Sequence, residues 1–274
     1  MLQKLRLGRR GSRQGGARWF AWWETDLHKT LQELRITGGE PLMSGYTWKL
    51  IEWFKQNQGR SSTKLAINSN LGFDADKLQE FVTAIEPLPH VELYTSMEAV
   101  GTQAEYIRDG LDYAQWLANV HTLLQSRAVK ALHVMCTVNA LCLDSLPELL
   151  NQLMDLKQLY GRDQVNFSLN ILRFPSFQSA LVLPEDIRTR YRVTLEEWLY
   201  KNRTNPWLHE HEVNHTQRLI DYLDVVKTPH SDTFEIPKLL NDFRQFYSQY
   251  DGRRHKNFSA AFPKLAAWYD SIQI

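Results

Sequence analysis

The segment LRITGGEPLMSG, residues 34–45, places two glycines, a carboxylate and a proline directly after a short apolar run. Gly38 and Gly39 lack a β-carbon, so the backbone can turn sharply there and a ligand can approach its N–H and C=O groups. Glu40 then offers a carboxylate to a cation, and Pro41 sets the start of the next helix. Paired glycines occur in many ordinary turns, but the complete string TGGEPL is far more specific. This loop is therefore the first candidate for a ligand-binding site.

Polar residues also follow the other apolar runs of the chain. The candidate strands are residues 34–37, 64–68, 91–95, 131–138 and 164–172. At the carboxyl ends of the last four lie Asn68-Ser69-Asn70, Ser96-Met97-Glu98, Val138-Asn139 and Arg173-Phe174-Pro175. Parallel strands bring their carboxyl ends to one edge of a sheet, where α/β proteins bind their ligands. We therefore expect a site at these strand ends.

Helical patterns alternate with the strands and indicate the fold. They cover residues 46–56, 75–85, 113–124 and 146–159. The strands recur about every 30 to 40 residues, which is the size of a βα unit. This alternation predicts an α/β protein with a parallel sheet, and five such units favour a partial (β/α) barrel over residues 19–184. Residues 185–274 show no such alternation and are predicted to form a helical C-terminal extension.

Composition excludes several classes of protein. The net charge of +1 argues against a nucleic-acid partner, and no apolar run approaches the length of a membrane span. With two cysteines and nothing resembling a secretory signal, a cytoplasmic location is the default expectation. Residues 1–18 are rich in Arg and Gly, carry no acidic residue and lack apolar periodicity. We expect that segment to be disordered or not part of the native fold.

The string TGGEPL and the strand ends that follow it resemble the radical S-adenosylmethionine (SAM) superfamily, most of all its branch with a SPASM or twitch extension. The resemblance runs from about Leu34 to Pro175 and continues more faintly to the C-terminus, so residues 185–274 would be twitch-like. It implies a partial barrel of radical SAM type and a SAM-binding site at the carboxyl ends of the strands. The residues it implies for that site are Gly38, Gly39, Glu40, Ser69, Asn70, Ser96, Arg108, Asn139 and Leu172.

The resemblance also implies a role for most of these residues. Gly38, Gly39 and Glu40 would orient the methionyl amine of SAM. Ser96 and Arg108 have the spacing of the family's serine and arginine that grip the SAM carboxylate, as a guanidinium is suited to do. Ser69 and Asn70 stand at the family's TNG-like strand ending. The nucleoside would be positioned by Asn139 and Leu172.

The chain departs from the family upstream of Gly38. Residues 1–33 contain no cysteine, whereas the family carries a CxxxCxxC motif whose thiolates hold a [4Fe–4S] cluster. Cys136 and Cys142 cannot replace a closely spaced triad, and we expect them to be buried small apolar residues. Residues 185–274 also contain no cysteine, which excludes a SPASM-type auxiliary cluster there.

Two interpretations follow from the missing motif. The first is an N-terminally truncated radical SAM enzyme, which when complete would take an electron from an external donor and cleave SAM at the cluster. The resulting radical would abstract hydrogen from an unknown substrate, a peptide or a small metabolite. The chain alone is then expected to be inactive, and no catalytic residue is assigned. The second interpretation is a cluster-free SAM-binding or scaffold protein.

A remote alternative is a zinc hydrolase. The stretch His211-Glu212-Val213-Asn214-His215 matches HExxH, in which two histidines one helical turn apart face a metal, and Glu235 is a conceivable third ligand. Short patterns of this kind arise by chance, and the neighbours His209, Glu210 and Thr216 are polar, whereas the zinc motif needs a helix buried beside a cleft. A solvated helix face is the preferred interpretation, and no metal ligand is assigned.

Overall fold

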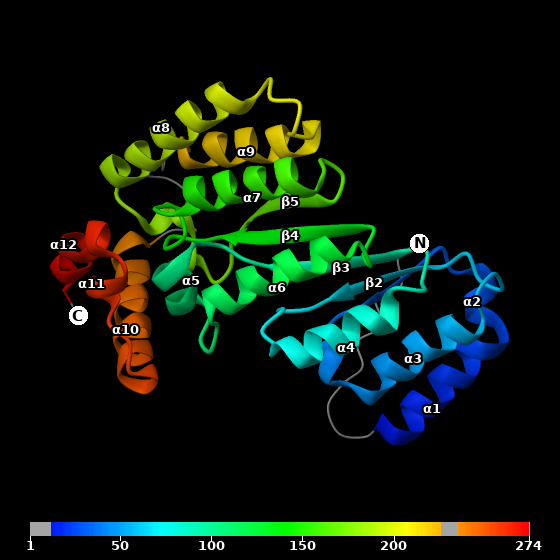
Figure 1. The fold of residues 1–274 in the computed structure, drawn as a ribbon. Helices are drawn as coiled ribbons and strands as arrows, with labels where there is room; N and C mark the ends of the chain where they lie inside the picture. The colour runs from blue at the N-terminus through cyan, green and yellow to red at the C-terminus, as the bar shows by residue number, and fades with distance from the viewer. Residues whose placement is uncertain (1–11, 226–234, 274) are drawn as a thin grey trace. The chain divides into compact units, whose positions relative to one another are not determined.

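The structure, a computed structural model, describes residues 12–225 and 235–273 (Figure 1). Five strands form one parallel sheet in the order β1-β2-β3-β4-β5, so the sheet follows the order of the chain. The strands are β1 (Glu33–Ile36), β2 (Lys64–Asn68), β3 (Val91–Ser96), β4 (Ala131–Val138) and β5 (Val165–Ile171). These are the five strands expected from the sequence, and the expected α/β class is confirmed.

Helices connect the strands as the alternating pattern predicts. They are α3 (Gly45–Gln56), α4 (Ala75–Ile85), α5 (Gly101–Ile107), α6 (Tyr113–Ser126) and α7 (Leu146–Tyr160), with the short 3₁₀ turn η2 (Pro41–Met43) before α3. Only α5 was not expected, because seven residues give too short a pattern to recognise. Before β1 lie α1 (Ser12–Trp22), the π-helical turn η1 (Trp23–Leu27) and α2 (His28–Thr30).

The described residues after β5 contain helices and no strand, as expected for a helical C-terminal extension. They form η3 (Ser176–Gln178), η4 (Ala180–Val182), α8 (Glu185–Asn202), α9 (Glu210–Leu223), α10 (Ile236–Arg254), α11 (Phe258–Ala261) and α12 (Pro263–Ser271). The boundary expected at residue 184 stays a prediction. The same holds for the segment 1–18, of which residues 1–11 lie outside the described part and residues 12–18 belong to α1.

The chain divides into two compact units. Of the described residues, 12–95 and 115–133 make up the first unit, and 96–114, 134–225 and 235–273 make up the second.

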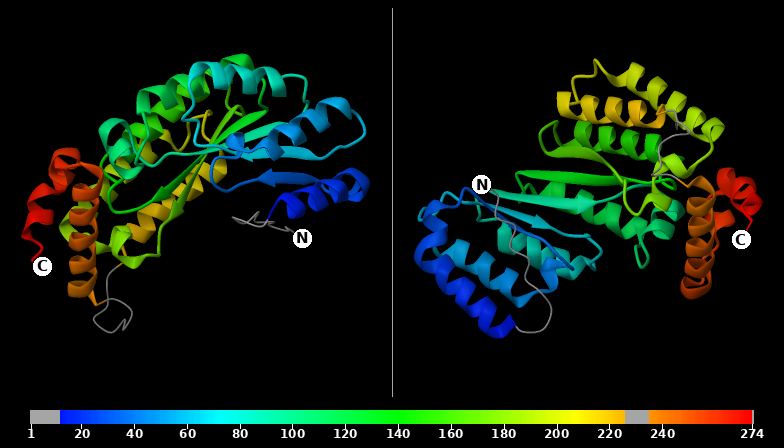
Figure 2. Two further views of the ribbon diagram at one scale, coloured as in Figure 1. Left: turned by 90° about the horizontal axis from the view of Figure 1, so that it is seen from below. Right: turned by 180° about the vertical axis from the view of Figure 1, so that it is seen from behind.

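In the first unit, α3 and α4 lie side by side along one face of the strands (Figures 1 and 2). Their apolar faces meet where Trp48 and Phe81 pack edge to face, with ring centroids 6.4 Å apart. Trp23, fully buried, packs on Trp53 at the end of α3 with 5.2 Å between ring centroids. Burying such large apolar side chains stabilises the unit, at about 25 cal/mol per Å² removed from water.

The helices of the second unit pack in two groups. The helices α7 and α9 pack on β5, and α8 lies beside α9 (Figure 1). Elsewhere α5, α10, α11 and α12 share an aromatic cluster, in which Phe258 stacks on Tyr269 at 3.9 Å between centroids. Tyr106 of α5 meets Phe262 edge to face at 5.0 Å and donates a hydrogen bond to Asp251 of α10 at 2.7 Å. The cluster explains why α10–α12 fold onto this unit.

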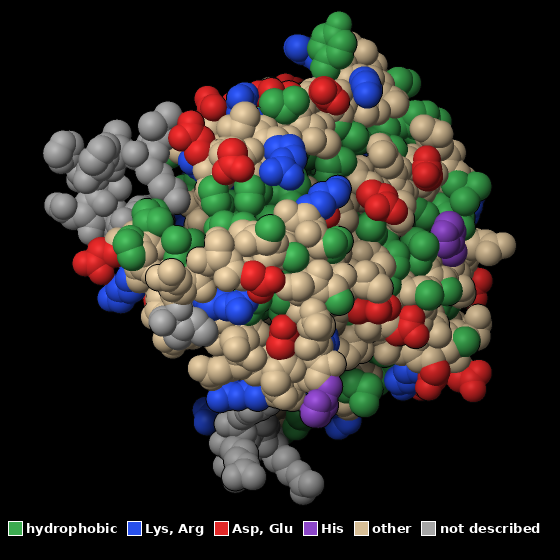
Figure 3. All heavy atoms as spheres, turned by 90° about the vertical axis from the view of Figure 1, so that its left-hand side faces the viewer, with side chains coloured by type: hydrophobic (Ala, Val, Ile, Leu, Met, Phe, Trp, Pro, Cys, Tyr) green, Lys and Arg blue, Asp and Glu red, His purple; other side chains and the backbone are tan. Residues whose placement is uncertain are grey.

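The surface carries mixed charge. On the face that Figure 3 shows, acidic and basic side chains are interspersed, in keeping with the net charge of +1. Within residues 12–225 and 235–273, no helix combines the length and apolar character needed to cross a bilayer.

Candidate functional site

The loop after β1 exposes its backbone at two glycines. Gly38 and Gly39 have φ values of 99° and 55°, which side chains with a β-carbon rarely adopt. Nothing lies within 4 Å of the point that a β-carbon would occupy at either residue. The conformation therefore favours glycine, most strongly at Gly38, and the space beside the backbone is open.

Glu40 fixes this loop with its carboxylate. One oxygen, Oε1, accepts from Leu42 N at 3.1 Å, and the other, Oε2, accepts from Asn70 N at 2.8 Å, which ties the loop after β1 to the loop after β2. Each carboxylate oxygen has two acceptor positions, so both oxygens retain capacity for a further donor. Among the described residues, no Lys, Arg or His forms an ion pair with Glu40.

The end of β2 adds an acceptor that the sequence did not single out. Asn68 Oδ1 is buried and has no hydrogen-bond partner, a state that costs free energy unless a donor is supplied. Ser69 is 5% exposed, and its Oγ accepts from Leu71 N at 3.1 Å. Asn70 Oδ1 accepts from Gly72 N at 2.9 Å. The predicted residues Ser69 and Asn70 thus use these side-chain oxygens within the loop, while Asn68 holds the spare acceptor.

The first unit also has a polar row on the sheet face opposite its buried apolar positions. Along β3, Val91 and Leu93 are buried while Glu92 and Tyr94 are half-buried. Tyr94 stacks on His133 of β4 at 4.3 Å between ring centroids, and the guanidinium of Arg35, on β1, lies 4.0 Å from the centroid of the Tyr94 ring. The period-2 alternation could have revealed this row, which the sequence analysis missed.

Hydrogen bonding joins the side chains at the centre of this row. Tyr94 Oη donates to Glu92 Oε2 at 3.1 Å, and His133 Nε2 lies 3.3 Å from the same oxygen. Burial, with a smaller contribution from the Glu92 carboxylate, raises the pKa of Tyr94 to about 12. Its phenol therefore stays protonated and serves as a donor. A half-buried stack of this kind suits the face of a planar ligand group.

In the second unit, Arg108 is already paired. Its Nε and Nη2 donate to Glu98 Oε2 and Oε1 at 2.6 and 2.5 Å, a bidentate ion pair. Glu98 is 4% exposed, whereas the Arg108 side chain is 32% exposed. The Nε/Nη2 edge of the guanidinium is thus occupied by a carboxylate of the chain itself. The roles expected of Arg108 and of Ser96, the last residue of β3, stay predictions.

The remaining predicted residues lie at the ends of β4 and β5. Asn139 Oδ1 accepts from Leu141 N at 2.9 Å, and Leu172 N donates to Val138 O at 2.9 Å. Both residues are half-buried. The structure brings Glu40 and Asn70 together within the first unit and describes Ser96, Arg108, Asn139 and Leu172 within the second, so the nucleoside contacts stay predictions.

The two cysteines do not fit an iron–sulfur cluster. Cys136 and Cys142 are free and 1% and 0% exposed, which confirms that they are buried small residues. A hydrogen bond with the neighbouring thiol of Cys142, followed by burial, raises the pKa of Cys136, so that thiol stays protonated. A cluster needs thiolates, three of them in the family pattern. Within the part of the chain that the structure describes, no three His, Cys, Asp or Glu side chains gather as a metal site.

The HExxH stretch forms the first turns of α9, and the expectation of a solvated helix face is wrong at its centre. Glu212 is fully buried. Its Oε2 accepts from His209 N at 2.9 Å in a capping box, because a glutamate three residues after the N-cap reaches back to that N–H. Its Oε1 accepts from Phe167 N at 2.9 Å and lies 2.9 Å from Lys157 Nζ.

These contacts do not support the zinc-hydrolase alternative. The zinc motif uses its glutamate as a general base toward a metal-bound water, but the Glu212 carboxylate is committed to two backbone donors and an ammonium. His215 Nδ1 accepts from Leu169 N at 3.2 Å, so one ring nitrogen is committed to β5. Glu235, the conceivable third ligand, is the exposed N-cap residue of α10.

Comparison with known proteins gives distant structural neighbours. They include native anSMEcpe with bound AdoMet and the Cp18Cys peptide, the same protein with bound AdoMet and the Kp18Cys peptide, and native anSMEcpe with bound AdoMet. Their TM-scores are 0.41, 0.41 and 0.40, each with 12% identity over 63% of this chain, and 47–48% of the neighbour is covered. This chain therefore spans about half the length of these neighbours. No family model and no curated protein matches the sequence. A TM-score below 0.5 assigns neither ligand nor activity to this chain.

Proposed function

We propose that the chain binds SAM and that the loop after β1 holds its methionyl amine. The observation that carries the proposal is the state of Glu40. Its carboxylate is oriented by two backbone N–H groups, has no cationic partner among the described residues, and follows two glycines whose surroundings are open. A fixed carboxylate beside an open stretch of backbone suits an ammonium, which has three N–H donors to place.

Further acceptors support an amine as the recognised group. The backbone carbonyls of Gly38 and Gly39 lie in the same loop, and Asn68 Oδ1 at the end of β2 lacks a donor. In the proposed function these oxygens share the ammonium protons with Glu40. The resemblance assigns the SAM carboxylate to Ser96 and Arg108 and the nucleoside to Asn139 and Leu172.

The function proposed for this chain is SAM binding, not radical chemistry. Reductive cleavage of SAM by an external electron donor, followed by hydrogen abstraction from a peptide or small metabolite, needs three cluster thiolates. The two buried cysteines do not supply them, so no step of the proposed function runs through a cluster. Radical catalysis would need a protein that supplies the three cluster thiolates, and it is a separate proposal.

Isothermal titration calorimetry of the chain with SAM tests the binding. Glu40→Gln keeps the size of the side chain but removes its charge, and a charge-assisted hydrogen bond contributes about 1.5–3 kcal/mol, so we expect SAM affinity to fall by about tenfold or more. Glu52→Gln, at an exposed position of α3 in the same unit, is the matched control and should bind as the native chain does.

A ligand without the amine separates this role from general damage to the site. 5′-Methylthioadenosine lacks the whole amino-acid end of SAM, so the native chain and Glu40→Gln should bind it equally. Equal SAM affinity for the native chain and Glu40→Gln would refute the role of Glu40. An absence of SAM binding at millimolar concentration would refute the function itself.

A further inference from the structure

The loop between β2 and α4, residues 69–74, contains a residue in an unfavourable backbone conformation. Leu71 has a φ of 53°, in the left-handed region that bulky side chains rarely adopt, and the residue is fully buried. Such a conformation costs free energy and persists only where the surrounding structure holds it in place. The contacts that hold Leu71 therefore decide the shape of this loop.

Asn119 of α6 supplies two of these contacts. Its Nδ2 donates to Leu71 O at 2.9 Å and to Phe73 O at 2.8 Å, so both hydrogens of the amide group are used. Its Oδ1 accepts from Gln115 Nε2 at 2.8 Å, one helical turn earlier, and this bond orients the amide. The side chain of Asn119 thus holds the loop from both ends of residues 71–73.

The position of Asn119 in α6 is otherwise a core position. Asn119 is 2% exposed, and Trp116, Val120 and Leu123 on the same side of the helix are at most 1% exposed. An apolar residue would fill this place without needing a partner, whereas a buried amide is retained where it is hydrogen-bonded. Hydrogen bonding to the loop is therefore what Asn119 provides and an apolar side chain could not.

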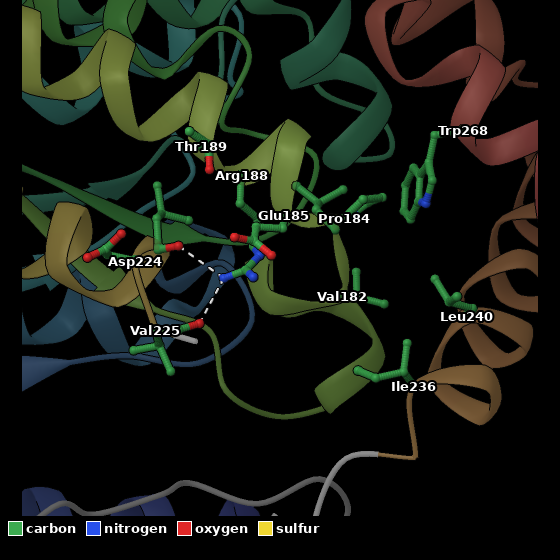
Figure 4. Close-up of a pocket in the computed structure, with 12 residues that line it drawn as sticks. Val182, Pro184, Glu185, Arg188, Thr189, Asp224, Val225, Ile236, Leu240 and Trp268 are labelled. Atoms are coloured by element: carbon green, nitrogen blue, oxygen red, sulfur yellow. Dashed lines mark hydrogen bonds between the residues drawn. The ribbon is translucent and has the colours of Figure 1, made fainter. Parts of the chain in front are cut away.

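The second unit contains the same kind of anchor. Arg188 of α8, which is 5% exposed, lies in the wall of a cavity, and its Nη1 donates to Leu223 O and Val225 O at 3.0 Å each (Figure 4). In both units a buried side chain thus binds two carbonyls that are two residues apart. At Arg188 the anchored segment is the end of α9, whereas at Asn119 it is the loop that contacts Glu40.

The loop anchored by Asn119 carries one of the donors that orient Glu40. Asn70 N, directly before Leu71, donates to Glu40 Oε2 at 2.8 Å. On its other side, Leu71 N donates to Ser69 Oγ at 3.1 Å, which tightens the same turn. All these residues belong to the first unit. The direction of the Asn70 N–H therefore depends on the backbone that Asn119 holds.

We propose that Asn119 is a positioning residue for the ammonium site at Glu40. It holds Leu71 in the left-handed conformation and thereby directs the Asn70 N–H at Glu40 Oε2. This inference rests on the proposed function and adds that the carboxylate is set in place before the ligand arrives. Asn119 acts through the loop and not on the ligand.

Isothermal titration calorimetry in a double-mutant cycle tests the coupling between Asn119 and Glu40. Asn119→Ala removes both donors and leaves space in which water can satisfy the two carbonyls, so we expect the chain to fold. It should lower SAM affinity by about fivefold in the native chain and by less than about twofold in the Glu40→Gln background. Affinity for 5′-methylthioadenosine, which lacks the amine, should not change. Losses of equal size in both backgrounds would overturn the positioning role.

Hydrogen exchange of the Asn70 amide gives a second readout that needs no ligand. Because the loop loses its anchor, this amide should exchange at least about tenfold faster in Asn119→Ala than in the native chain. Leu124→Ala is the control, since it removes a buried apolar side chain from the same helix and leaves the bonds from Asn119 in place. Similar Asn70 exchange in the two variants would overturn the role of Asn119.

The two proposals can fail separately. An absence of SAM binding by the native chain would refute the proposed function, while faster Asn70 exchange in Asn119→Ala would still support the anchor. SAM binding that is equal in the native chain and Asn119→Ala would leave the proposed function standing and overturn the positioning role. If circular dichroism shows that Asn119→Ala is unfolded, Asn119→Ser, which keeps one hydroxyl donor, takes its place with the same outcomes.

Discussion

Two glutamates of this protein accept the same kind of backbone hydrogen bonds but differ in burial and in whether a cation lies beside them. Glu40 of the first unit and Glu212 of the second each accept two backbone N–H bonds, one from their own turn and one from a neighbouring strand or loop. Glu212 is fully buried and has the ammonium of Lys157 at 2.9 Å. Glu40 is half-buried and has no such partner in the described residues.

The presence or absence of a cationic partner distinguishes the structural carboxylate of Glu212 from that of Glu40, which we propose as a ligand contact. At Glu212 the chain supplies the cation itself, so the site is complete and holds α9 to α7 and β5. At Glu40 no described residue supplies a cation, and in the proposed function the SAM ammonium takes that position. The Lys157–Glu212 pair thus serves as an internal example of the ammonium contact that we propose for SAM at Glu40.

The largest effect should come from breaking the complete pair. Lys157→Met leaves the Glu212 carboxylate buried without its cation, and removing one partner of a buried pair typically costs about 3–5 kcal/mol. We therefore expect the free energy of unfolding in urea to fall by that amount. Glu40→Gln should cost less than Lys157→Met, because it loses one backbone hydrogen bond to a carboxylate oxygen, about 1.5–3 kcal/mol, but no buried ion pair. Equal losses in the two variants would remove the distinction.

A smaller effect should come from the backbone beside Glu40. Gly38→Ala forces a β-carbon onto a φ of 99° and should lower the free energy of unfolding by about 1–2 kcal/mol. Gly45→Ala, at the first residue of α3, has no such constraint and has open space around it, so it should be neutral or slightly stabilising. Urea unfolding of the two variants measures the difference, and a stable Gly38→Ala would show that the loop does not need its left-handed residue.

The smallest effect should be a dependence on pH near Glu212. Burial lowers the pKa of His215 below its usual value, and its Nδ1 must stay unprotonated to accept from Leu169 N. Below about pH 6.5 the unfolded chain therefore binds a proton that the folded chain does not, and stability falls as the pH drops. The loss should be modest because the ring is only half-buried and solvent screens its charge.

Urea unfolding between about pH 7.5 and 5, the range in which histidine titrates, measures this loss. His215→Asn keeps an acceptor for the Leu169 N–H without a group that titrates in this range, so its stability should depend less on pH. An identical pH dependence in the native chain and His215→Asn would assign the effect to other groups.

Local pattern was enough for most of the fold. The bounds predicted for β2, β4 and α4 are those of the structure, because alternation and helical spacing are set by near neighbours in the chain. The sharp turn at Gly38 and Gly39 was also visible, since the two glycines directly follow a strand. The short helix α5 was missed because seven residues carry little periodicity.

Pairing between distant residues could not be predicted in the same way. The polarity around HExxH indicated a solvated face, yet Glu212 is buried because Lys157 and the Phe167 N–H, both far away in sequence, compensate its charge. Arg108 and Glu98 were both noticed, but only the structure shows that they bind each other. The stack of Tyr94 on His133 also joins residues from different strands.

The sequence by itself determined the order of strands and helices, the exposed glycine loop and the absence of three thiolates for a cluster. The tertiary structure decided which charged groups already have a partner: Glu212 is paired with Lys157 and Arg108 with Glu98, while Glu40 has no cationic partner among the described residues. The physical reason is the reach of the forces involved. Backbone preference acts over a few residues, whereas burial and ion pairing depend on which segments the fold brings together.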